Sequence, residues 1–314
     1  MLSNKSNQKQ NKPKANNQLR FEAIGTAWEC DFFEFLSVEK VALLQKKMFA
    51  RIEEFDAVYS RFRSDSLVSR ISHQAGRYAF PEDAKQLFAV YRALYGVTDG
   101  MFTPLVGSLM EEIGYDASYS LQPKKQFSTL PDWDEVLSFT DTKLMTTKPV
   151  LLDFGAGGKG YLVDLLAELL QQEGIRAYCL DGGGDLLYRA TTNQTLRVGL
   201  EHPQNPQQII GVAEIHNQSI CGSAGNRRAW RDYHHLMNPK TLQPADQYLA
   251  SWVVADSGLV ADSLATAIMF MDDEMLKQVQ HDTLGGKKFE YLLLLPEFTI
   301  KKSDNFPAEL YFQH

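Results

Sequence analysis

Residues 150–160, VLLDFGAGGKG, join a short apolar run to a turn that holds four glycines around Lys159. Apolar residues continue at helical spacing over residues 161–172, so the sequence predicts a strand at 150–154, a glycine turn and a helix. A tight turn alone requires fewer glycines than this. Exposed amides at a helix N-terminus beside an ammonium group form an anion site. The segment therefore predicts a phosphate-binding turn, which suits the pyrophosphate of a nucleotide.

The same glycines also match a GxGxxG pattern, and Asp181 lies 21 residues after Gly160, near the place of the ribose carboxylate in a dinucleotide fold. An NAD-dependent oxidoreductase is thus one interpretation. Two features count against it: the turn lies halfway along the chain, and Asp181 opens a second glycine cluster. A P-loop is excluded more firmly, because Asp153 replaces its first glycine and Gly160 replaces its Ser or Thr.

Elsewhere helices and strands are mixed without strict alternation. Helices are predicted over residues 38–59, 82–97 and 258–270. Strands are predicted over residues 21–33, with a break near Gly25-Thr26, and over 177–180, 196–200, 209–215, 248–255 and 291–295. This pattern favours an α+β fold with mixed β-sheets and packed helices over a doubly wound parallel fold. Residues 1–18 are polar and basic and predict a disordered tail, which leaves residues 19–314 as a single domain.

Composition narrows the class of protein. The formal net charge of −7 disfavours a general nucleic-acid binder, because phosphate contacts require clustered Lys and Arg. Three cysteines without a CxxC pair disfavour a disulfide framework and a zinc site. No apolar run reaches eighteen residues, so no transmembrane segment is predicted. The sequence as given has no secretory or lipoprotein signal, which predicts a cytoplasmic protein, or an extracytoplasmic one whose N-terminus was trimmed.

Three further groups are candidates for chemistry. Asp262 and Thr266 stand four residues apart, so both project from one face of a predicted helix, and a carboxylate with a hydroxyl suits magnesium. From spacing alone the plainer interpretation weighs more, in which Asp262 faces solvent and Thr266 bonds back to its own helix. His235 can accept a proton near neutral pH, although a lone histidine is more often an ordinary core or surface residue. Phe62 is either a residue of the hydrophobic core or a flat surface on which the ring of a ligand can stack.

Seven segments, taken together and in order, resemble the ApbE family of FAD:protein FMN transferases. The resemblance covers about residues 21–271. The segments are Gly25-Thr26, the S-x-Y/F-x-x-D-S element at 60–66, Gly100-Met101-Phe102-Thr103-Pro104, the D-x-G-x-x-x-K-G-Y signature at 153–161, Gly183-Gly184-Asp185, the H-x-x-D-P turn at 235–239, and Asp262 with Thr266.

The resemblance implies a magnesium-dependent transferase that moves FMN from FAD to a Ser or Thr hydroxyl of an acceptor flavoprotein and releases AMP. It implies magnesium ligands at Asp262, Thr266 and the backbone carbonyl of Ala156. His235 would deprotonate the acceptor, and Lys159 would neutralise charge on the pyrophosphate. The residues implied to bind FAD are Ile24, Phe62, Met101, Phe102, Thr103, Asp153, Lys159, Gly183, Gly184, Asp185 and Met237.

Three positions depart from the family pattern. Asn238 replaces the usual Asp before proline, Gly222-Ser223-Ala224 replaces Thr-Ser-Gly, and Thr103-Pro104-Leu105 replaces Asp-Pro-Thr. Each change touches the flavin or acceptor side, whereas the implied metal ligands are intact. The alternative to the transferase is therefore an FAD-binding protein or FAD pyrophosphatase without efficient transfer.

Overall fold

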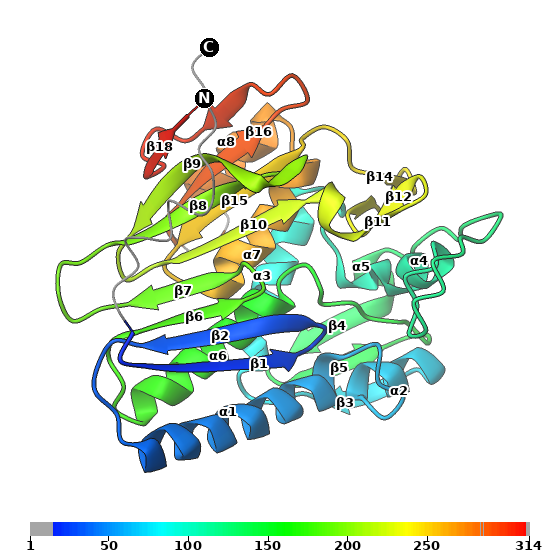
Figure 1. The fold of residues 1–314 in the computed structure, drawn as a ribbon. Coiled ribbons are helices and arrows are strands. Elements are labelled where there is room, and N and C mark those ends of the chain that lie inside the picture. Colours follow the sequence, from blue (N-terminus) through cyan, green and yellow to red (C-terminus); the bar gives the residue numbers. More distant parts are fainter. Residues whose placement is uncertain (1–14, 283, 285, 312–314) are drawn as a thin grey trace.

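A central sheet of eight strands organises the chain, and the computed structural model describes residues 15–282, 284 and 286–311 (Figure 1). Within these residues every neighbouring pair of strands in the sheet is antiparallel. The spatial order is β1 (Asn17–Ala23), β2 (Thr26–Phe32), β6 (Tyr178–Gly182), β7 (Leu186–Arg189), β10 (Ser219–Ala224), β15 (Ala250–Ala255), β16 (Phe289–Leu294) and β17 (Ile300–Lys302).

The expected tail ends earlier than the sequence suggested. Asn17 and Gln18, which the sequence assigned to it, begin β1 and pair with Phe32 and Asp31 of β2. Residues 1–14 of that tail lie outside the described residues. The predicted break near Gly25-Thr26 is confirmed, because the turn between β1 and β2 falls there, with Ile24 at φ 43° and Gly25 at φ 74°.

Helices cover one face of the sheet, and Figure 1 shows α6 and α7 behind it. The helix predicted over 38–59 is confirmed at both ends as α1 (Val38–Tyr59), where the hydroxyl of Ser37 caps the first turn. Its buried residues follow helical spacing. The other long helices are α3 (Ala84–Val97), α6 (Gly158–Gln172) and α7 (Gly258–Ala267), the last extended by a 3₁₀ turn at Ile268–Phe270.

A second, three-stranded sheet covers the opposite face. Its order is β18 (Ala308–Leu310), β9 (Asn205–Ile215) and β8 (Leu196–His202). Because strand side chains alternate between faces, neighbouring residues enter different cores. Val253 of β15 packs in the core on the helix side, whereas Trp252 and Val254 pack in the core between the two sheets. The α+β class is confirmed as three layers: helices, the eight-stranded sheet and the small sheet.

The remaining elements are short and include a separate three-stranded sheet in the order β3, β5 and β4. They are α2 (Leu67–His73), β3 (Gly76–Ala79), a 3₁₀ turn at Pro104–Val106, α4 (Gly107–Glu112), α5 (Trp133–Val136), β4 (Leu137–Thr140), β5 (Lys143–Thr146), a 3₁₀ turn at Gly225–Arg228, β11 (Ala229–Trp230), β12 (Tyr233–His234), β13 (Met237–Asn238), β14 (Gln243–Pro244) and α8 (Asp273–Asp282). In the described part of the chain no helix combines the length and apolarity that crossing a bilayer requires.

The strand predicted over residues 150–154 is wrong. The segment carries the buried Leu152 and Phe154, but it pairs with no strand in the described structure. The N–H of Asp153 instead bonds to the carbonyl of Pro104 at 2.7 Å. The glycine turn therefore does not follow a strand of a parallel sheet. This removes the structural context of the NAD-dependent interpretation, which requires a βαβ unit.

Candidate functional site

The glycine turn is closed by a carboxylate. Oδ1 of Asp153 accepts the N–H of Gly155 at 2.6 Å, and the N–H of Gly158 bonds to the carbonyl of Phe154 at 2.7 Å. Helix α6 begins at Gly158, so Lys159 lies in its first turn. The N–H groups of all four glycines in the turn, residues 155, 157, 158 and 160, have acceptors within the protein. The exposed amides that the sequence predicted are therefore occupied, and the ammonium of Lys159 is the group of this turn that is suited to an anion.

Helix α7 approaches the turn so closely that only glycine fits at position 160. A Cβ on Gly160 would lie 2.1 Å from the carbonyl oxygen of Gly258 and 2.6 Å from Cβ of Asp262. The backbone N–H of Gly160 donates to Oδ2 of Asp262 at 2.9 Å. The resemblance implied that the glycine turn and the carboxylate-bearing helix share one site, and the fold brings them into contact here.

Lys159 lies between two buried carboxylates. Its ammonium forms an ion pair with Asp185 and lies 3.8 Å from Oδ1 of Asp262. Although burial works against its charge, these two carboxylates raise the pKa of Lys159 above its ordinary value. Burial and the neighbouring Asp185 raise the pKa of Asp262 to about 7. Two carboxylates facing one ammonium leave a deficit of positive charge that a cation would correct.

The implied metal ligands share one cavity of about 310 Å³. Asp262, Thr266 and Ala156 line it together with Lys159. Over the described residues no three His, Cys, Asp or Glu side chains gather to bind a metal. One carboxylate with hydroxyl and carbonyl oxygens is a donor set for a hard cation that keeps waters or phosphate oxygens, and it fits magnesium better than zinc.

A second cavity of about 350 Å³ adjoins the first and is lined by aromatic rings. The ring of Phe62 stacks on Tyr119 with centroids 5.5 Å apart and meets Tyr115 edge-on at 5.6 Å. Ile24 also lines this cavity. Residues common to both cavities are Gly25, Tyr115, Asp153, Gly155, Lys159 and Arg228. Polar and aromatic halves of one cleft thus meet at the glycine turn.

His235 lines the polar cavity. Its Nδ1 atom is buried and has no hydrogen-bond partner among the described residues. Burial, followed by the nearby charge of Arg228, lowers the pKa of His235 to about 3, so the imidazole is neutral at physiological pH. A neutral ring with an unpaired nitrogen in a cavity can exchange a proton with a bound group.

The glycine-aromatic segment and the turn after His235 meet at the same cavity. Met101, Phe102, Thr103 and Met237 line it, and Nδ2 of Asn238 lies 3.4 Å from Sδ of Met101. The departure at Asn238 therefore touches the segment expected to face the flavin.

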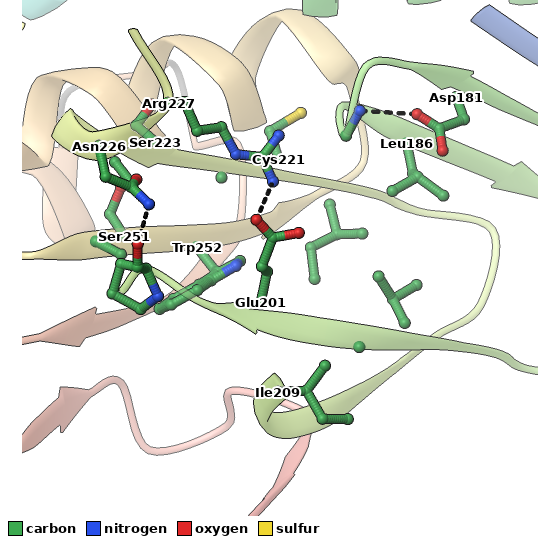
Figure 2. Close-up of a pocket in the computed structure, with 18 of the residues that line it drawn as sticks. Asp181, Leu186, Glu201, Ile209, Cys221, Ser223, Asn226, Arg227, Ser251 and Trp252 are labelled. Carbon is green, nitrogen blue, oxygen red and sulfur yellow. Dashed lines mark hydrogen bonds and ion pairs between the residues drawn. The ribbon is translucent and has the colours of Figure 1, made fainter. Parts of the chain in front are cut away.

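Two of the expected FAD contacts lie elsewhere, although Gly183 lines the polar cavity. Asp185 is 1% exposed and pairs with Lys159. Gly184 lines a third cavity, of about 330 Å³, between β8 and β10. Figure 2 shows Arg227 turned toward Glu201 in this third cavity.

Sequence reasoning missed three residues of the cleft. Arg61 lines the aromatic cavity, and Tyr115 and Arg228 line both cavities. Tyr115 and Arg228 fall outside every motif, so no local signal marked them. Arg61 lies inside the 60–66 element, but a sequence does not show that an arginine is buried.

Comparisons with known proteins show the family and the fold. Residues 24–286 match the family model described as ApbE family. The chain is 25% identical over 285 residues to a Vibrio cholerae protein named FAD:protein FMN transferase, covering 84% of each chain. Among solved structures, the flavin transferase ApbE from Vibrio cholerae superposes with a TM-score of 0.74 at 21% identity, covering 92% of this chain and 98% of that one. The ApbE protein from Thermotoga maritima gives 0.76 at 20% identity, covering 93% and 99%. These two structures share the fold.

Proposed function

The chain belongs to the ApbE family, and on that premise we propose that it is an FAD:protein FMN transferase, as its relatives are named. One arrangement carries the proposal: the glycine turn and Lys159 of α6 meet Asp262 and Thr266 of α7 in one cavity. A nucleotide pyrophosphate needs positive charge around it. This cavity supplies the ammonium of Lys159 and oxygen ligands for a hard cation.

The donor substrate in this proposal is FAD. Its flavin ring occupies the aromatic cavity beside Phe62 and Ile24, and its pyrophosphate lies over the glycine turn. Met101, Phe102, Thr103 and Met237 border the polar cavity. Gly183 extends the polar wall, Asp153 holds the turn, and Asp185 acts through Lys159 rather than by touching FAD.

The metal in this proposal is Mg²⁺. Asp262, Thr266 and the carbonyl of Ala156 would hold it, because they provide hard oxygen donors in one cavity. Bound there, it supplies neutralisation of the charge that builds on the pyrophosphate oxygens. Lys159 contributes a second positive charge that the protein fixes in advance, since Asp185 orients it.

The reaction in this proposal is phosphoryl transfer to a partner flavoprotein. A Ser or Thr hydroxyl of the acceptor attacks the FMN phosphorus, and His235 accepts its proton. The bond to the bridging oxygen of the pyrophosphate breaks and AMP leaves. The imidazole is a weak base in the protein alone, and the negative charge of a bound pyrophosphate raises its pKa. Attack by water instead gives FMN and AMP.

The test follows AMP and protein-bound flavin. Purified protein is incubated with FAD and magnesium, with EDTA as the control, and with an acceptor flavoprotein as a separate arm. We expect magnesium-dependent AMP release and flavin that stays on the acceptor after denaturation. Tight FAD binding without AMP release would contradict the transferase.

A second candidate is an FAD-binding protein or FAD pyrophosphatase without efficient transfer. The contact of Asn238 with Met101 favours it, because this departure from the family pattern touches a residue that lines the polar cavity. AMP release that does not rise when an acceptor is added would support this candidate.

A further inference from the structure

Arg61 is buried with part of its hydrogen-bonding capacity unused. Its side chain is 2% exposed, and Nε bonds to Oδ2 of Asp153 at 2.5 Å. Nη1 and Nη2 have no hydrogen-bond partner in the part of the chain that the structure describes. A buried donor left without a partner costs about 1–3 kcal/mol, so a bound group that accepts from both nitrogens would be strongly favoured.

The surroundings of Arg61 restrict what that group can be. The guanidinium carbon lies 4.1 Å from the centroid of Phe62 and 5.0 Å from that of Tyr115. All three residues line the aromatic cavity. Stacking on rings occupies a face of the guanidinium and leaves the N–H donors at its edge. The edge is suited to a flat ligand that presents acceptors in its plane.

Charge favours an uncharged acceptor here. Asp153 already neutralises Arg61, so the pair as a whole attracts a phosphate weakly. Lys159 and Arg228 line both cavities, and the oxygen ligands of the polar cavity would hold a cation for the pyrophosphate. Carbonyl oxygens and ring nitrogens on the pyrimidine edge of a flavin are uncharged, lie in one plane and accept hydrogen bonds.

We propose that Arg61 recognises the flavin ring by donating from Nη1 and Nη2 to acceptors on its pyrimidine edge. The inference rests on the proposed function and adds a specificity-determining residue to it. An adenine ring presents an amino donor on its corresponding edge, which two guanidinium donors would oppose. Arg61 thereby selects which end of the dinucleotide enters the aromatic cavity.

The experiment distinguishes binding of Arg61 to the flavin ring from binding of Arg61 to the pyrophosphate. Dissociation constants for FAD, ADP and riboflavin are measured for the wild type, Arg61→Met and Arg61→Lys. We expect Arg61→Met to weaken FAD and riboflavin by about 10-fold, the equivalent of 1.4 kcal/mol, and to leave ADP within twofold. Binding should also shift the visible absorption band of FAD in the wild type, and the shift should be lost in Arg61→Met.

Other results would overturn this role of Arg61 or the proposed function. Equal weakening of FAD and ADP would assign Arg61 to the pyrophosphate and overturn the proposal, as would unchanged FAD affinity and spectrum. If Arg61→Met does not unfold cooperatively, Arg61→Lys provides the same comparison, because it keeps a positive charge beside Asp153. A wild-type protein that binds no FAD would refute the proposed function itself, a result distinct from a failure of this assignment.

Discussion

The backbone N–H of Gly160 and Oδ2 of Asp262 are joined by a 2.9 Å hydrogen bond that ties the glycine turn to helix α7. The carboxylate proposed to bind magnesium therefore also fixes the distance between the two helices. Metal site and helix packing are coupled at this point.

We expect Gly160→Ala to destabilise the protein by at least about 1–3 kcal/mol, because its Cβ would overlap the backbone of Gly258. Gly96→Ala is the matched control: Gly96 lies within α3, and a Cβ there meets nothing within 4 Å. That change should stabilise the protein by up to about 1 kcal/mol. Urea unfolding measures both. Equal stability of Gly160→Ala and wild type would show that α7 can move away at little cost.

Asp262→Asn should lower magnesium-dependent AMP release by more than about 100-fold, since even groups behind metal ligands contribute 10–100-fold. The amide oxygen can still accept the N–H of Gly160, so the fold should persist. Magnesium should raise the melting temperature of the wild type and leave that of Asp262→Asn unchanged. Undiminished AMP release would remove Asp262 from the metal site.

Lys159→Met should lower the free energy of unfolding by about 3–5 kcal/mol, because it leaves Asp185 buried without its partner. Adding Asp185→Asn should recover much of that loss. Neither variant should release AMP at the wild-type rate, because both lack the ammonium. A double variant as unstable as Lys159→Met would show that Asp185 is not the group left unpaired.

We expect His235 to make the stability of the fold sensitive to acid. Burial, with Arg228 next, lowers its pKa to about 3, whereas an unfolded histidine titrates near 6.5. Between these values the unfolded chain binds a proton that the native chain does not, so this contribution to stability is present above pH 6.5 and lost as pH falls toward 3.

Unfolding of His235→Gln by urea at pH 7 and pH 4.5 tests this expectation. The variant should lose less stability on acidification than the wild type. His73→Gln, which removes an exposed imidazole of α2, should follow the wild type. Parallel pH curves for the wild type and His235→Gln would contradict the lowered pKa.

The local sequence pattern predicted both ends of α1 correctly. The buried residues of this helix follow one face, and Ser37 caps its first turn. The same reasoning failed at residues 150–154. Leu152 and Phe154 are as apolar and buried as strand residues. A strand also needs a neighbouring segment to pair with, and the local sequence does not show whether one is present. Strand β10 is the reverse case, because it forms where the sequence pattern predicted no strand. Its Cys, Gly, Ser and Ala residues carry little strand propensity.

The site residues also divide into those that the sequence predicted and those that only the structure shows. Spacing placed Asp262 and Thr266 on one helical face, and the order of motifs brought them into one hypothesis with Lys159. The burial of Arg61 against Phe62 depends on contacts between distant segments. A charged residue beside a turn normally lies in solvent, so its role became visible only in three dimensions.

Gly222, Ser223 and Ala224 of β10 line both the polar cavity and the cavity in Figure 2, as does Arg227 just after the strand. Gly222 pairs with Trp252, whose indole is close enough that a Cβ on Gly222 would lie 3.0 Å from Cδ1. In the proposed function, Trp252 therefore lies on the strand next to one wall of the nucleotide cleft. With the other three tryptophans of the chain replaced, its emission would follow occupancy of the cleft in stopped-flow mixing.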